Sequence, residues 1–167
     1  MNTTAPPAAP MLYEAVKASR LAEGLSPGQV DVLARLLTLE PVQAQQVLAR
    51  EGSADNRLYL VVQGSLAIVK HIGTPEETTL VTLEAGDFAH ELGFLDGAPR
   101  YASLQAAAPG QVLVLEREQL ESLIETHPRI LYAVMCAIVR AVHRVQTRLS
   151  MQASELTNYI VKQHGRY

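Results

Sequence analysis

The sequence contains one cysteine, Cys136, and no excess of positive charge. A single cysteine excludes a disulfide within the chain and favours a reducing compartment. The apolar run "LYAVMCAIV" around Cys136 predicts a buried, unreactive thiol. The net charge is −3, with 14 Lys and Arg against 17 Asp and Glu. This balance disfavours a nucleic-acid binder that works through general basicity.

Targeting and membrane signals are also scarce. The N-terminus, "MNTTAPPAAP", has no positive charge and no apolar segment, so it is not a signal peptide. We expect residues 1–10 to form a disordered leader. The longest apolar stretch, residues 130–139, is about half as long as a membrane span requires. We therefore expect no membrane insertion and a cytoplasmic location.

Catalytic and metal-binding patterns are missing too. His90-Glu91 would start a zinc-protease helix motif, but that motif needs a second histidine where Phe94 stands. The histidines, at 71, 90, 127, 143 and 164, show no ligand spacing. Ser103 has no nucleophile-elbow pattern around it. We predict neither an enzyme nor a metal site.

What is present indicates a globular chain of 167 residues, 48% apolar and 19% charged. Helical spacing predicts one helix that ends at Gly24 and a second that begins after Ser26, an N-cap candidate, and runs to Pro41. From about residue 42 the pattern is that of strands, which we place at 45–52, 58–62, 65–71, 77–85 and on both sides of Pro109-Gly110 within 101–116. Short strands with glycine turns predict a mainly β, α+β fold, an antiparallel jelly-roll-like barrel with N-terminal helices.

The last third of the chain is predicted to be helical, with a short helix over 116–126 and a long helix from Pro128. We therefore divide the chain into a barrel domain, 11–127, and a C-terminal helix, 128–167. Apolar residues in this helix step alternately by four and three: Leu131, Met135, Ile138, Val142, Val145 and Leu149, continued by Leu156. Packing on the barrel explains the first half of this seam. Beyond Val145 little domain remains to cover it, so we predict a parallel homodimer through residues 131–156, with Gln152 helping to fix its register.

The most informative stretch is "GDFAHELGFLDGAPRYAS", residues 86–103. It places Glu91 nine residues before Arg100, with glycines, a proline and a short apolar run between them. Taken alone, such a pair indicates only a structural ion pair in a loop.

Together with "REGSADNRLYLVVQGSLAIV", residues 50–69, this stretch resembles the cyclic nucleotide-binding domain family. Residues 86–103 are similar to the family's phosphate-binding cassette, Gly-x-Phe-x-Gly-Glu-Leu-Ala followed by Pro-Arg-Ser/Thr-Ala-Thr. The resemblance covers roughly residues 25–149. It implies a regulatory sensor for a cyclic nucleotide, cAMP or cGMP, with no other cofactor. The long helix would pass the signal to an unknown downstream protein.

The resemblance also implies roles for individual residues. Glu91 would accept the ribose 2′-hydroxyl, and Arg100 would bind the phosphate through charge-assisted hydrogen bonds. His90, Leu92 and Ala102 would contribute backbone groups, at the N-terminus of a short helix that faces the anion. Inside the barrel, Glu91 and Arg100 would balance each other's charge.

Two residues depart from the family pattern, both on the phosphate side. His90 replaces a glycine, so it adds bulk and gives up the freedom of positive φ. Tyr101 replaces a Ser or Thr whose hydroxyl touches the phosphate. These changes predict altered specificity, weak binding or loss of binding. In the last case the fold would serve as an interaction module with an empty pocket.

In bacterial members the long helix also contacts the base, and those positions fall here near Val145 and Gln146, with Thr147 next. Val145 cannot hydrogen-bond a base, whereas Gln146 and Thr147 could. Nearby, residues 140, 144 and 148 form an arginine stripe, which is either a solvated helix face or a contact for a phosphate or an acidic partner. Activator-type regulators continue into a helix-turn-helix domain, whereas this chain ends at Tyr167. We expect no DNA-binding domain in it, and a third hypothesis is the sensor half of a transcription regulator.

Overall fold

The structure, a computed structural model, describes residues 9–164, without the side chains of Leu149, Gln152, Ala153 and 155–164. Most of the expected leader therefore lies outside the described residues, and the first helix already begins at Pro10. The helices are α1 (Pro10–Lys17), η1 (Arg20–Ala22), α2 (Pro27–Ala34), α3 (Glu91–Asp96), α4 (Arg117–Glu121), α5 (Leu123–Thr126) and α6 (Pro128–His164). The strands are β1 (Leu37–Val42), β2 (Val47–Ala49), β3 (Arg57–Lys70), β4 (Thr78–Leu83), β5 (Phe88–Ala89) and β6 (Ser103–Glu116).

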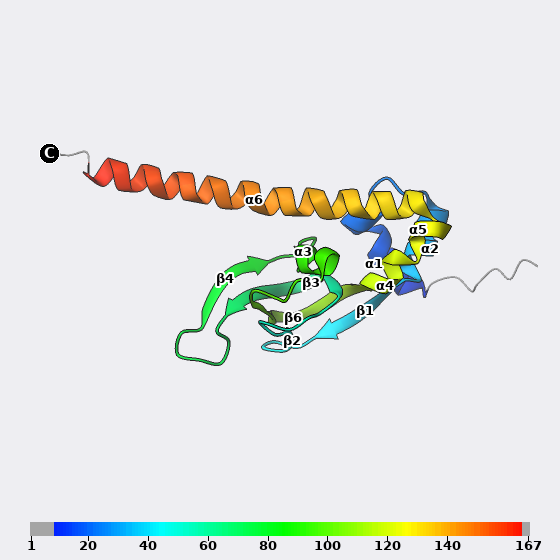
Figure 1. The fold of residues 1–167 in the computed structure, drawn as a ribbon, viewed down its shortest axis with the longest axis horizontal. Helices are drawn as coiled ribbons and strands as arrows, with labels where there is room; N and C mark the ends of the chain where they lie inside the picture. Colours follow the sequence, from blue (N-terminus) through cyan, green and yellow to red (C-terminus); the bar gives the residue numbers. More distant parts are fainter. Residues whose placement is uncertain (1–8, 165–167) are drawn as a thin grey trace, which may run out of the picture.

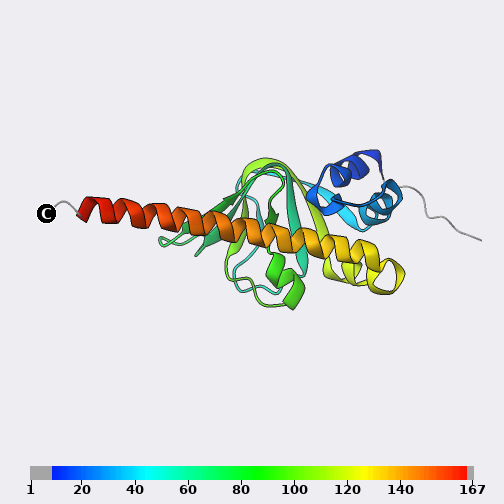
Figure 2. The ribbon, with the colours of Figure 1, turned by 90° about the horizontal axis from the view of Figure 1, so that it is seen from above.

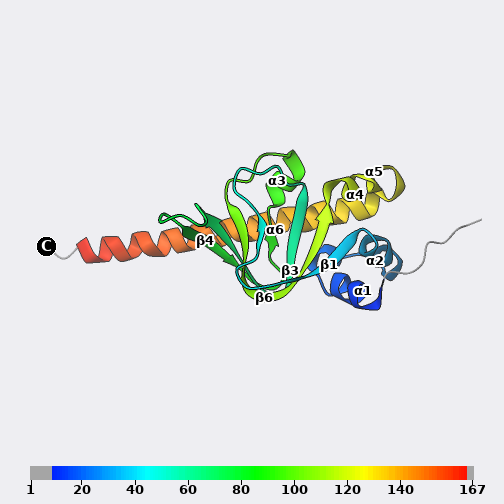
Figure 3. The ribbon, with the colours of Figure 1, turned by 90° about the horizontal axis from the view of Figure 1, so that it is seen from below.

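The strands form one antiparallel sheet with flanking helices, which confirms the predicted jelly-roll-like fold (Figure 1). Its main order is β1-β6-β3-β4, with β2 beside β6 and β5 beside β3. The sheet stays open, because the outer strands β1 and β4 do not pair with each other in the described part of the chain. Seen from below, the strands β1, β6 and β3 lie in front of α6, so the helix runs along the far face of the sheet (Figure 3).

Two strands of 14 residues replace the four short strands predicted around Gly64 and Gly110. β3 and β6 run past these glycines with shifts of register between Val61 and Leu66. At this point the two backbones approach so closely that a Cβ on Gly110 would overlap the carbonyl oxygen of Gln63. The glycines therefore allow a close crossing within continuous strands, which is a known use of glycine in sheets.

The second predicted helix is confirmed at its start and wrong at its end. Ser26 forms a capping box with Gln29, as the N-cap prediction requires. The helix was predicted to continue to Pro41 but ends at Ala34, and residues 37–42 form the strand β1. Since β1 pairs only with β6, it lies at the sheet edge, where a proline costs no ladder hydrogen bond.

The long helix α6 crosses one face of the sheet and extends beyond it (Figure 2). Its first half packs into the main core through Ile130, Val134, Ile138 and Ala141. By length and a mean hydropathy of 1.2, Pro128–Arg148 could also span a membrane. That evidence is weak, because core helices of soluble proteins pass the same test.

Candidate functional site

The predicted cassette forms a short projection beside β3 that consists of β5, α3 and the loop leading to β6. Phe88 pairs with Leu60 of β3, and Phe94 of α3 is fully buried in the same core cluster. These two aromatic anchors hold both ends of the segment against the sheet. The polar residues between them are therefore fixed in position by the core.

His90 is the N-cap of α3 and has a left-handed backbone, with φ 69° and ψ 31°. The prediction that histidine gives up positive φ is therefore wrong. The backbone adopts the left-handed conformation that glycine allows, at a cost of about 1–2 kcal/mol for a residue with a side chain. Its ring is only 9% exposed and meets the Tyr59 ring edge-on, with 6.3 Å between centroids.

The electrostatics of this position keep His90 neutral at pH 7. Burial first, and the charge of Arg100 second, lower the pKa of His90 to about 4. Its Nδ1 atom is buried and has no hydrogen-bond partner among the described residues. The ring therefore presents one free polar atom inside the protein.

Arg100 is buried, at 4% exposure, and points into the domain. Its Nη1 donates to the carbonyl of His90 at 3.0 Å, and its Nη2 donates to the carbonyls of Asp55 and Arg57 at 2.8 and 2.7 Å. Its ion-pair partner is Asp55, at 3.5 Å between Nη2 and Oδ2. Within the described residues, Nε has no partner.

This arrangement corrects the expected charge balance, because Asp55 rather than Glu91 pairs with Arg100. Glu91 is partly buried in the first turn of α3, and its carboxylate makes no ion pair within the part of the chain that the structure describes. Burial raises the pKa of Glu91, and the charge of Asp87 raises it further, while its own backbone amide and Arg100 oppose the shift. The carboxyl group is thus left available for a hydroxyl partner.

The other predicted cassette residues differ in burial, since some lie at the surface and one lies in the core. Leu92 is exposed, and Ala102 is buried. Tyr101 is 62% exposed, so its side chain lies at the surface and leaves the interior free. The Tyr101 carbonyl accepts a hydrogen bond from Lys70, which also pairs with Glu51.

The structure adds a residue that the sequence did not reveal, Arg117 at the start of α4. Its Nε donates to the carbonyl of Phe94 at 2.6 Å, and its Nη2 donates to that of Gly93 at 3.0 Å. These carbonyls close the C-terminal end of α3, where a cation is favourable. The contacts join residues 23 and 24 positions apart through backbone atoms, so no motif could signal them. By contrast, Asp55 lies within the quoted segment 50–69 and could have been found there.

The predicted base contacts do not join this group within one chain. Gln146 and Thr147 are exposed on α6 and line a shallow depression formed by α6 residues alone. Thr147 donates its hydroxyl proton to the carbonyl of His143. The α6 residue that does contact the cassette segment is Arg148, whose Nη2 lies 3.5 Å from Oδ1 of Asp87. The structure thus brings together Glu91, His90 and Arg100.

This fold and site define a class of ligand-binding regulatory domain, and comparison with known proteins gives the family. The family model described as cyclic nucleotide-binding domain matches residues 39–127. The chain therefore belongs to the cyclic nucleotide-binding domain family. No group of three or more His, Cys, Asp or Glu side chains in the described part of the chain could hold a metal ion.

Individual relatives extend the likeness beyond the cassette. The cyclic AMP receptor protein of Thermus thermophilus is 27% identical over 141 residues, which are 84% of this chain and 65% of that protein. A cyclic nucleotide-gated potassium channel of Mesorhizobium japonicum is 30% identical over 118 residues, 71% of this chain and 31% of the channel. This chain thus spans less than two thirds of either relative. A solved cyclic nucleotide-binding domain from Methylobacillus flagellatus has a TM-score of 0.76 at 22% identity and covers 88% of this chain and 84% of that one, so it shows the shared fold.

Proposed function

We propose that this protein is a cytoplasmic regulatory module, not an enzyme, that binds a cyclic nucleotide, cAMP or cGMP, at the cassette. The observation that carries the proposal is the buried guanidinium of Arg100, whose Nε has no partner among the described residues. A buried donor without a partner costs free energy, which a phosphate oxygen would recover. Glu91 would accept the ribose hydroxyl, since its carboxylate makes no ion pair in the described chain.

His90 takes part in this proposal through its ring as well as its backbone. The neutral imidazole can carry its proton on Nδ1, and that atom has no partner within the described residues. An Nδ1–H group would donate to a phosphate oxygen or to a purine acceptor. The histidine thus supplies a donor where the family's glycine supplies none, which favours altered specificity over loss of binding.

Contacts between the cassette segment and α6 support transmission of the ligand state through that helix. Asp87 lies just before β5 and pairs with Arg148 of α6. It also lies 3.9 Å from Arg20 of η1. A ligand that moves the cassette would change these ion pairs and shift α6. This is allostery if the two helix positions bind the ligand with different affinity.

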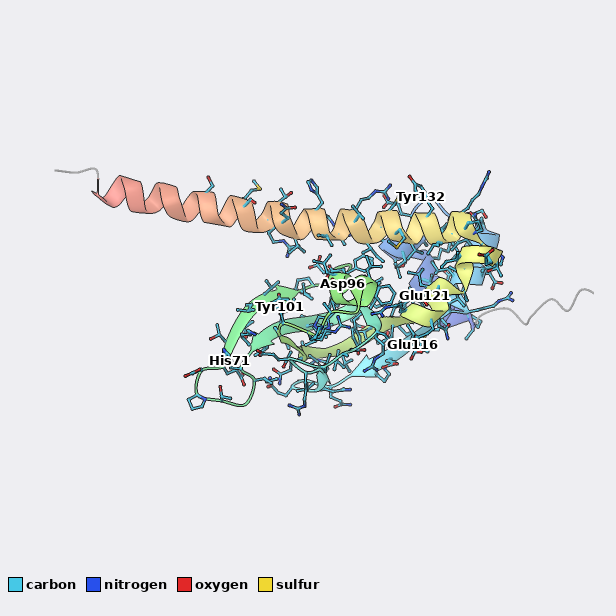
Figure 4. All side chains as sticks on the ribbon, viewed as in Figure 1. His71, Asp96, Tyr101, Glu116, Glu121 and Tyr132 are labelled. Carbon is cyan, nitrogen blue, oxygen red and sulfur yellow. The ribbon has the colours of Figure 1, made fainter. Side chains whose placement is uncertain are left out.

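A homodimer through α6 completes the proposal, with a seam shifted from the predicted one. Ile138 of the predicted seam is buried in its own domain, whereas Tyr132 and Val139 are exposed. Tyr132 lies on the side of α6 that faces away from the sheet (Figure 4). Met135, between them, and Val142, one turn beyond Val139, are partly exposed. The spacing of three and four continues in the sequence through Gln146, Leu149, Ala153 and Leu156. A second copy along this stripe would place Gln146 at the seam, where it could reach a base.

Calorimetric titration of the full chain with cAMP and cGMP tests the binding proposal. We expect saturable binding that weakens at least about 100-fold in Arg100→Gln, because a charge-assisted phosphate contact is lost. The matched control is Arg129→Gln, an exposed arginine in the first turn of α6, which should leave the affinity unchanged.

An empty interaction module is the competing function, and one observation favours it. Both Nη atoms of Arg100 are already bonded to backbone carbonyls, as in a purely structural arginine. In that case neither nucleotide would give heat or raise the melting temperature. The α6 stripe and the sheet surface would then be the working surfaces.

A further inference from the structure

A basic cleft lies outside the cassette, between the N-terminal helical segment and α6. In two views at right angles, the blue N-terminal segment lies near the yellow beginning of α6 (Figures 1 and 2). The cleft has a volume of about 330 Å³ and is lined by Lys17, Ala18, Ser19, Arg20, Ala22, Glu23 and Arg144. None of these lining residues belongs to the cassette, so a ligand here would occupy a separate site.

Positive charge is in excess around this cleft. The five cations of the region are Lys17, Arg20, Arg140, Arg144 and Arg148, and the three carboxylates that face them are Glu14, Glu23 and Asp87. Lys17 pairs with Glu14, and Arg140 pairs with Glu23. Asp87 is shared between Arg20 and Arg148, so these carboxylates are all engaged.

Among the cations that line the cleft, Arg144 is left without a carboxylate partner by these ion pairs. Within the described residues it forms no ion pair, and its Nη2 atom is buried without a hydrogen-bond partner. Burial lowers the pKa of Arg144, and the neighbouring charges of Arg20 and Arg140 lower it further. The carboxylates of Asp87 and Glu23 act in the opposite direction. A guanidinium donor that is both buried and unpaired is unfavourable unless an anion completes it.

We propose that this cleft binds an oxyanion group of a small molecule, a phosphate or a carboxylate, with Arg144 as its main contact and Lys17 and Arg20 at its sides. Arginine presents paired donors that match both kinds of oxyanion. The bound anion would bridge η1 and α6 and would relieve the repulsion among the cations. Occupancy would therefore hold the first half of α6 against the N-terminal segment, independently of the cassette.

Titration of the full chain with inorganic pyrophosphate and with citrate, at low ionic strength, tests the site. The two probes distinguish a phosphate ligand from a carboxylate ligand. We expect saturable binding of at least one probe, weakened at least about tenfold in Arg144→Gln and about threefold in Lys17→Gln. The matched control is Arg140→Gln, which removes the same charge from an exposed arginine paired with Glu23 and should change affinity less than about twofold.

Arg100→Gln separates this site from the cassette, because the probe should bind that variant as it binds the wild type. Melting curves of each variant confirm that it is folded, and Arg144→Lys gives a second test, with partial recovery of affinity expected. The proposal is overturned if neither probe binds, if Arg140→Gln weakens binding as much as Arg144→Gln, or if Arg100→Gln abolishes binding.

Discussion

At the scale of single residues, His90 and Arg100 show how a residue that departs from the family pattern sits beside one that matches it. The histidine adopts a backbone conformation that suits glycine and buries a ring beside Tyr59. The arginine is fixed by three carbonyls and Asp55, so its position does not depend on Glu91. The cost of His90 is both backbone strain and an unpartnered nitrogen, and both costs can be measured.

The first prediction concerns the pH dependence of stability. The pKa of His90 is about 4 in the folded chain against 6.5 for the free group, so the unfolded chain takes up the proton first. The free energy of unfolding should therefore fall as pH drops from about 6.5 to about 4, by an amount on the order of 3 kcal/mol, and stay unchanged by this group above that range. In His90→Asn this part of the slope should vanish, as denaturant titrations at several pH values would show.

The control for this prediction is His71→Asn. His71 also has a positive φ, 55°, but it is exposed. Asparagine tolerates the left-handed backbone in both places. An equal change of slope in the two variants would refute the assignment to His90.

At the scale of elements, contacts between segments far apart in sequence hold the cassette. Arg117 ties the end of α3 to the start of α4. Asn56, just before β3, also holds α4, because it donates to both carboxylate oxygens of Glu118 at 2.7 Å. The helices after β6 are thereby fastened to the cassette at one end. At its other end, the ion pair between Asp87 and Arg148 fastens the cassette to α6.

The second prediction follows from the Arg117 contact. Arg117→Gln leaves the last carbonyls of α3 without their charged donor, so it should lower the free energy of unfolding by about 1–2 kcal/mol. We also expect weaker cyclic nucleotide binding, because α3 carries Glu91. Denaturant titration and calorimetry measure the two effects, and Arg129→Gln serves as control. Unchanged stability would show that the contact is dispensable.

The third prediction concerns the crossing of β3 and β6. Gly110→Ala adds a Cβ that overlaps the Gln63 carbonyl, so the strands must move apart, at a cost of about 2–3 kcal/mol. Gly28→Ala is the comparison, since nothing lies within 4 Å of its added Cβ in α2. There the substitution should stabilise by about 0.5–1 kcal/mol. Thermal unfolding of both variants checks the opposite signs.

The sequence predicted elements better where local chemistry decides them than where packing does. The capping box at Ser26 and the proline start of α6 are local signals, and both are confirmed. Residues 37–42 have helix-like spacing but pair with β6, which no local pattern shows. The motif pointed to Glu91 and Arg100, and the quoted segment 50–69 also contained Asp55, the carboxylate that pairs with Arg100. Arg117 could not be found in this way, because it acts through backbone carbonyls that only the fold brings near. Spacing alone also does not tell which face of α6 the domain covers, and the structure buries Ile138 of the predicted seam while it leaves Val139 exposed.

At the scale of the whole molecule, α6 contacts the cassette segment on one face and carries an exposed apolar stripe on the other. Its inner face packs on the core, and its outer face carries Tyr132 and Val139. The anion cleft at Arg144 lies between the same helix and the N-terminal segment. One rigid element is thus in contact with every site proposed for this protein.

The fourth prediction tests the dimer. Val139→Lys places a charge in the centre of the exposed stripe and should convert a dimer into a monomer in sedimentation equilibrium. Ile124→Lys is the control, because Ile124 is also exposed and apolar but lies on α5. Sedimentation of the wild type as a monomer, or the same loss in both variants, would contradict a seam on α6.

Contact between the Arg100 guanidinium and the ligand phosphate is the central claim, and the Nε–H resonance of Arg100 in NMR spectra reports on it directly. Arg100→Lys identifies that resonance by its absence. The account predicts that saturating cAMP or cGMP shifts it downfield in the wild type, as a charge-assisted hydrogen bond forms. An Nε–H resonance that stays in place at saturating concentrations of both nucleotides would contradict the account.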